Sequence, residues 1–74
     1  MYVLVTIKRK ENNMEVKLYE SREEVENAMI LRYNSEVRKA SKLDWKHTFL
    51  DRNKKYASVD DWVDRVELRY CEVA

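Results

Sequence analysis

The side chains that could support catalysis are few in this sequence. His47 is the only histidine and Cys71 the only cysteine. A catalytic histidine needs a nucleophile or an acid as partner, and a metal site needs further ligands at a defined spacing. An activated thiolate needs a positively charged, partly exposed setting, whereas Cys71 is followed by Glu72. We therefore expect an ordinary polar histidine, an inert cysteine and no catalytic residue.

The densest group of carboxylates is Asp60, Asp61 and Asp64. Such oxygens can bind a divalent ion, but the spacing lacks the glycine and the glutamate of a calcium-binding loop. A solvated turn is the simpler interpretation, and we expect no metal. The chain has no glycine and no proline, which excludes a glycine-rich phosphate loop, a dinucleotide-binding fingerprint and a nucleophile elbow. The sequence thus predicts neither a cofactor nor an enzyme.

A basic block covers residues 38–55, where seven cations against two carboxylates give a formal charge of +5. Residues 1–37 carry −1 and residues 56–74 carry −3. Two interpretations stay open: a surface that neutralises nucleic-acid phosphates, or a cationic helix end followed by a solvated loop. Trp45 and Phe49 lie within the block, and we expect them to close the core rather than to stack on bases. The cations are Arg38, Lys39, Lys42, Lys46, Arg52, Lys54 and Lys55.

Length and composition limit the class of protein. A chain of 74 residues is sufficient for one small domain, residues 1–74, which buries only about 60% of its unfolded surface. The net charge of +1 selects neither nucleic acid nor membrane as a partner. No apolar run approaches the roughly 20 residues that span a bilayer, and a single cysteine is typical of a reducing compartment. We expect a cytoplasmic protein.

One long amphipathic helix is predicted from Ser21 to about Leu43. Ser21 and Glu24 fit a capping box, acidic residues occupy the first turns, and basic residues occupy the last. The periodicity places one apolar stripe on the helix and leaves Leu31 on the opposite side. The stripe consists of Val25, Ala28, Met29, Tyr33, Val37, Ala40 and Leu43.

Alternating segments on both sides of this helix predict strands. Residues 2–8 and 14–19 form a hairpin around a polar turn, with Asn12 and Asn13 as the positive-φ pair. Its apolar face, formed by Val3, Val5, Ile7, Met14, Val16 and Leu18, needs a cover, and we expect the helix to supply it. Residues 55–59 and 62–73 form a second hairpin, whereas 44–54 is compatible with a loop, a short helix or a short strand. The predicted fold is α+β: an antiparallel sheet of two β-hairpins packed against one long helix (ββαββ).

This pattern resembles small proteins of bacteriophages and other mobile elements. The resemblance lies in the opening Tyr2-Val-Leu-Val-Thr-Ile, the charged helix, Tyr56-Ala-Ser-Val and the closing Val66-Glu-Leu-Arg-Tyr-Cys-Glu-Val. Some such proteins inhibit host defence, as anti-CRISPR proteins do, by binding a host effector without performing chemistry. The resemblance implies no transferable functional residues, and the near-neutral charge differs from the strongly acidic members that mimic DNA.

We therefore expect a non-enzymatic binding protein, phage-encoded, that blocks a host protein or ribonucleoprotein. Two alternatives remain: a small nucleic-acid-binding regulator that uses residues 38–55, and a homodimer or assembly subunit that uses a sheet edge or the Leu31 side of the helix. The predicted binding residues are Leu31, Arg38, Lys39, Lys42, Trp45, Lys46, Arg52, Lys54 and Lys55.

Overall fold

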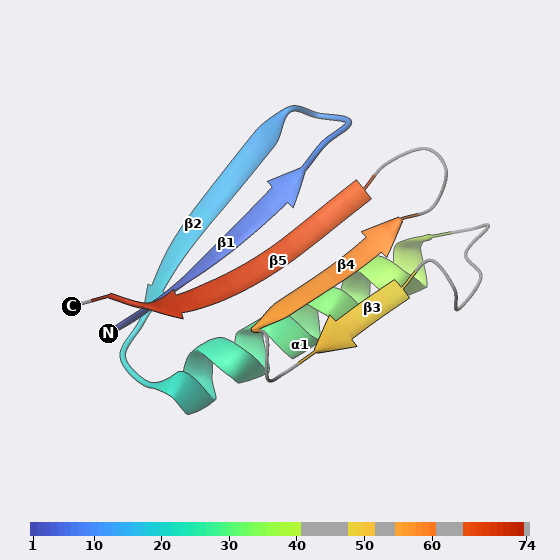
Figure 1. Cartoon of the computed structure of the whole chain (residues 1–74). Coiled ribbons are helices and arrows are strands. Elements are labelled where there is room, and N and C mark those ends of the chain that lie inside the picture. The colour runs from blue at the N-terminus through green and yellow to red at the C-terminus, as the bar shows by residue number, and fades with distance from the viewer. Residues whose placement is uncertain (41–47, 52–54, 61–64, 74) are drawn as a thin grey trace.

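The computed structural model describes residues 1–40, 48–51, 55–60 and 65–73 (Figure 1). It contains one helix and a five-stranded antiparallel sheet with the strand order β2-β1-β5-β4-β3. The elements are β1 (Tyr2–Lys8), β2 (Asn13–Tyr19), α1 (Arg22–Lys39), β3 (Thr48–Asp51), β4 (Tyr56–Asp60) and β5 (Arg65–Glu72). The α+β class is confirmed. The arrangement is β-β-α-β-β-β, so the prediction of two hairpins missed β3, which lies in the part of the chain that the sequence left open.

The first hairpin forms where it was predicted. Its register pairs Val3 with Leu18 and Val5 with Val16. In the turn, the backbone N–H of Asn12 donates to the carbonyl of Arg9 over 3.2 Å, and Asn12 has a φ of 51°. Asparagine tolerates this left-handed conformation because its short polar side chain bonds locally. Asn13 already belongs to β2, so the expected pair of positive-φ residues is reduced to one.

The strands from the two ends of the described chain lie side by side at the centre of the sheet (Figure 1). The register of β1 and β5 pairs Leu4 with Tyr70 and Thr6 with Leu68. Beyond the strands, the backbone N–H of Val73 donates to the carbonyl of Met1 over 2.8 Å. The long-range pairing therefore closes the fold and fixes which residues of β1 share a face with β5.

The helix α1 starts as predicted and ends earlier. The N–H of Glu24 donates to Ser21 Oγ over 3.1 Å, and the Glu24 carboxylate accepts from the N–H of Glu20 over 3.3 Å. These bonds satisfy donors that have no partner inside the helix. Ala40 is extended, and its N–H donates to the carbonyl of Glu36. The helix thus ends at Lys39 instead of about Leu43, which lies outside the described residues.

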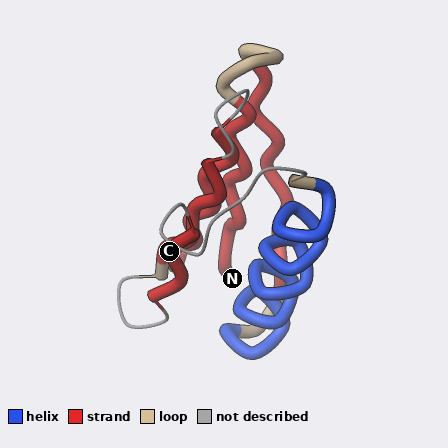
Figure 2. The backbone as a smooth tube through the Cα atoms, turned by 90° about the vertical axis from the view of Figure 1, so that its right-hand side faces the viewer, coloured by secondary structure: helices blue, strands red, loops and turns tan. Residues whose placement is uncertain are grey.

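Figure 2 shows the helix and the sheet as two layers, with the helix on one face only. The core between them is formed by side chains from α1 and three strands: Leu4, Val25, Met29, Ala57, Leu68 and Tyr70. Tyr70 is 1% exposed, and its hydroxyl donates to Glu26 over 3.2 Å, which ties β5 to the first half of the helix. Val66, Leu68 and Tyr70 alternate along β5 and form its buried inward face.

The prediction that the helix covers the hairpin face with Val3, Val5 and Ile7 is wrong, because the helix covers the opposite face. Leu4 and Thr6 are buried beneath it, whereas Met14, Val16 and Leu18 are exposed. The physical reason is register: directly opposed residues share a face, so the strongly apolar face of β5 brings Leu4 and Thr6 to the helix side. β1 is apolar on both faces, and its own pattern does not decide between them.

Two further residues differ from the prediction. Phe49 was expected in the core, but it pairs with Ser58 on the helix-free face and is 45% exposed. Lys55 was expected in a strand, but it adopts a φ of 58° in the turn before β4. A lysine in this region costs roughly 1 kcal/mol, and the sequence offers no glycine for it.

Candidate functional site

The helix-free face of the sheet carries six aligned apolar side chains on β1 and β2. Register pairs them across the two strands: Val3 with Leu18, Val5 with Val16, and Ile7 with Met14. Directly opposed Cβ atoms lie about 5 Å apart, so the six form one continuous surface. We call this surface, formed by Val3, Val5, Ile7, Met14, Val16 and Leu18, the open strip.

Much of the open strip is exposed. Met14 is 62%, Val16 55% and Leu18 63% exposed, while their partners on β1 are half-buried. Single exposed apolar residues are common, but a contiguous exposed patch of about 300–600 Å² on a monomer often marks an interaction site. The open strip is contiguous, because its members alternate along β1 and β2 and lie opposite one another across the two strands.

The other half of the helix-free face, on β4 and β5, is polar and internally paired. Glu67 is its centre: its carboxylate accepts from Arg9 at 3.1 Å and from the Tyr56 hydroxyl at 3.2 Å, and lies 3.3 Å from Arg65. The Arg69 guanidinium lies 5.5 Å from the centroid of the Tyr56 ring. The Glu67 carboxylate on this half is therefore already paired within the protein.

A depression of about 240 Å³ lies where the two halves meet. Its lining combines aliphatic side chains of β1 with an aromatic ring and two oppositely charged groups: Val5, Ile7, Tyr56, Glu67 and Arg69. Sites for small molecules and cofactors usually enclose about 300–1,000 Å³. This depression suits a single apolar side chain of a protein partner, bordered by polar groups.

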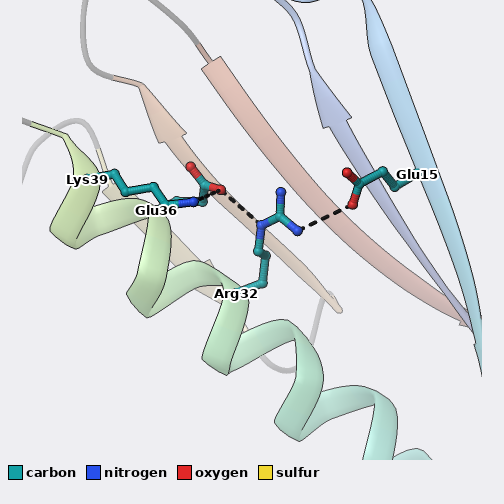
Figure 3. A network of polar contacts seen from close by, with 4 residues as sticks. All are labelled: Glu15, Arg32, Glu36 and Lys39. Carbon is teal, nitrogen blue, oxygen red and sulfur yellow. Dashed lines mark hydrogen bonds and ion pairs between the residues drawn. The ribbon is translucent and has the colours of Figure 1, made fainter.

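On the helix side of the sheet, Arg32 bridges α1 and β2 (Figure 3). Its Nε lies 2.9 Å from Glu36 Oε1, and its Nη1 lies 3.3 Å from Glu15 Oε2. Lys39 Nζ lies 3.9 Å from the same oxygen of Glu36. Glu36 is only 8% exposed, so these cations compensate a largely desolvated carboxylate. The network is structural: all four groups are neutralised by one another.

Leu31, predicted as a binding residue, is 69% exposed on α1. It lines a groove of about 280 Å³ between the helix and β2, together with Ala28, Arg32 and Lys17. β2 is the edge strand beside β1 (Figure 1), and the groove lies between this strand and the helix.

The described members of the predicted basic block do not form one patch. Arg38 and Lys39 are exposed in the last turn of α1. Lys55 lies beside Tyr70, with its Nζ 5.8 Å from the ring centroid, and Tyr70 bonds Glu26 near the start of the helix. From residue 26 to residue 39 the helix axis advances about 20 Å. Five further predicted residues lie outside the described part of the chain: Lys42, Trp45, Lys46, Arg52 and Lys54.

Comparison of the chain with models of protein families, with curated proteins and with solved structures finds no match.

Candidate chemistry is sparse in the described residues. They include no group of three metal-binding side chains, and no helix among them is long and apolar enough to cross a membrane. Cys71 is exposed with a free thiol. His47, Asp61 and Asp64 lie outside the described residues.

The pKa of Tyr2, which lies at the edge of the core, is raised. The Glu72 carboxylate accepts a hydrogen bond from the Tyr2 hydroxyl and raises the pKa of that phenol, and desolvation and the charge of Glu72 add to the effect. The Tyr2 ring also packs edge-on against Tyr70, with centroids 6.4 Å apart.

Sequence reasoning missed the open strip as a candidate site because it assigned the strip to the core. The signal was present: residues 2–7 are apolar or small on both faces, whereas residues 14–19 alternate with charges. A strand that is apolar on both faces belongs at the centre of a sheet with both faces occupied. One face of β1 is occupied by α1, and the other is the open strip.

Proposed function

We propose that this chain is a non-enzymatic protein-binding domain whose recognition surface is the open strip. The observation that carries the proposal is the exposure of Met14, Val16 and Leu18 beside three half-buried apolar partners. Apolar surface removed from water contributes about 25 cal/mol per Å², so covering this strip is favourable for any protein of matching shape.

The surroundings of the open strip suit a protein interface. Such interfaces have an apolar centre and a polar rim, and the Glu67 cluster with Arg9 and Arg65 supplies a rim on one side. Because the Glu67 carboxylate is already paired with Arg9 and Arg65, this part of the rim does not require a cationic partner. The depression beside Val5 offers a position for one anchoring side chain of the partner.

For the identity of the partner we follow the resemblance to small bacteriophage proteins. The proposed partner is a host protein, or the protein component of a host defence ribonucleoprotein, which this chain blocks as anti-CRISPR proteins do. The site of action is then the host cytoplasm. Inhibition by coverage needs no catalytic residue.

The test compares three versions of the protein in affinity capture from host cells, quantified by mass spectrometry. Val5→Glu places a carboxylate in the open strip, opposite Arg69 in the register, so we expect the sheet to tolerate it. Asn34→Glu adds the same charge on the exposed side of the helix. We expect one specific protein to be captured by the wild type and by Asn34→Glu and lost with Val5→Glu. Equal capture by all three versions, or no specific capture, contradicts the proposal.

A second candidate function is nucleic-acid binding. It is favoured by Phe49 and Tyr56 on the helix-free face, with ring centroids 6.0 Å apart and Arg69 beside Tyr56, since aromatic rings on a sheet can stack on bases. Gel shifts with single-stranded RNA and DNA at two salt concentrations test it. Binding that weakens with salt and is lost with Tyr56→Ala supports this alternative; absent binding removes it.

A further inference from the structure

The strand β2 forms one edge of the sheet and exposes its outer side (Figure 1). Odd-numbered residues of β1 bond towards β5, as the bonds at Met1 and Arg9 show. Hydrogen bonding alternates along a strand between its two neighbours, so even-numbered residues of β1 bond to β2. Their register partners on β2 are odd-numbered. The backbone N–H and C=O groups of Met14, Val16 and Leu18 consequently point outward from the edge.

We propose that a second copy of this chain pairs with this edge, with the two β2 strands antiparallel about a two-fold axis at Val16. In this register, Val16 lies opposite Val16 of the second copy, and Met14 lies opposite Leu18. Each of these pairs exchanges two backbone hydrogen bonds, because these residues carry the outward-pointing groups. The outward-pointing N–H and C=O groups of this long edge thereby gain hydrogen-bond partners. Proteins usually protect such an edge.

Charge complementarity selects this occupant and this register. With the axis at Val16, Glu15 lies opposite Lys17 of the second copy, twice by symmetry. These residues form the pairs without hydrogen bonds, in which side chains approach most closely. Moving the axis to Glu15 or to Lys17 places identical charges opposite each other, which is unfavourable. A strand whose sequence around its centre reads Met-Glu-Val-Lys-Leu is therefore self-complementary in one register.

The same two-fold axis also fixes where the groove lined by Leu31 lies in the pair. A rotation about an axis perpendicular to the sheet leaves both helices on the same face of the joined ten-stranded sheet. The groove beside β2 that Leu31 lines then faces the corresponding groove of the second copy. On the other face, the two open strips join into one apolar surface. The pairing uses the edge of β2, whereas the proposed partner binding uses the face, so each can fail without the other.

Charge reversal tests the pairing by sedimentation equilibrium over a wide concentration range. Lys17→Glu and Glu15→Lys each place like charges across the edge, and each should raise the dissociation constant of the homodimer about tenfold. Mixing the two variants should restore pairing as a heterodimer, since one chain then carries carboxylates at both positions and the other carries ammonium groups at both. Arg38→Glu, which makes the same charge change at the exposed helix end as Lys17→Glu makes at the edge, should leave the dissociation constant unchanged.

Circular dichroism of each variant checks folding, because Glu15→Lys also removes the contact with Arg32. An isotope-filtered nuclear Overhauser experiment on the mixed labelled protein checks the register directly. Contacts between the Hα protons of Glu15 and Lys17 of different chains are expected. A monomeric mass at every concentration overturns the proposal, and so does a dimer that neither variant weakens.

Discussion

Val5 and Val16 are register partners on β1 and β2, and their side chains lie together on the sheet face that α1 leaves uncovered. Their neighbours Leu4 and Thr6 are buried on the opposite face. The first hairpin thus contributes to the core with one face and retains an apolar surface on the other. An exposed apolar surface of this kind is the basis of our proposal that the protein is a binding domain.

Substitutions in the helix should separate core from surface. Met29 is fully buried in the core cluster, so Met29→Ala should lower the free energy of unfolding by about 2–5 kcal/mol. Leu31, two residues later, is mostly exposed. Leu31→Ala should therefore change the free energy of unfolding by less than about 0.5 kcal/mol. Urea denaturation at a protein concentration that favours the monomer measures both. A large loss with Leu31→Ala would show that the helix is turned differently.

Arg32 and Glu36 should be energetically coupled in their contributions to the stability of the fold. Among the described residues, Arg32→Met leaves the buried Glu36 carboxylate with the longer contact to Lys39, and the substitution should cost about 1–3 kcal/mol of stability. Combining it with Glu36→Gln should cost less than the sum of the two single changes, because the remaining amide needs no cation. A double-mutant cycle measured by urea denaturation yields the coupling energy. If the effects of the two substitutions on the free energy of unfolding were strictly additive, the contact would contribute nothing to stability.

The N-cap of α1 should contribute measurably to stability. Ser21→Ala removes the acceptor for the N–H of Glu24 and should cost about 1 kcal/mol, whereas Ser21→Asp keeps an acceptor and should cost little. Thermal unfolding followed by circular dichroism compares the two variants. Equal melting temperatures for both would contradict the capping role.

Alkaline pH should weaken the contact between Tyr2 and Glu72. The pKa of Tyr2 is raised in the folded state above its unfolded value of about 10. Its contribution to stability is therefore complete below about pH 10 and is lost as the pH rises through the folded pKa. Urea midpoints measured on both sides of this range should fall more for the wild type than for Tyr2→Phe. An identical fall of the urea midpoint in both proteins would show that other groups cause the loss of stability at alkaline pH.

The local elements of this fold could be predicted from the sequence because their signals are local. Ser21 and Glu24 indicate where the helix starts, and alternation in 14–19 and 62–73 predicts strands. The end of the helix was harder to locate, because Ala40 stops it without a glycine or a proline.

What the sequence could not supply depends on contacts between distant residues. The face of β1 is selected by its pairing with β5, where Leu4 lies opposite Tyr70, and no pattern within residues 2–8 encodes that choice. The exposure of Phe49 likewise follows from its place opposite Ser58 on an edge strand. For this reason the sequence predicted a candidate site at the helix end, whereas the structure exposes the open strip.

The most direct test of the open strip as the recognition surface is a nuclear magnetic resonance titration with the protein captured by affinity purification. Methyl signals of Val5, Val16 and Leu18 should shift or broaden on addition of that protein, while those of the buried Val25 and Met29 stay in place. Changes confined to Leu31 and to the amides of Arg38 and Lys39, with the open strip unaffected, would contradict the account.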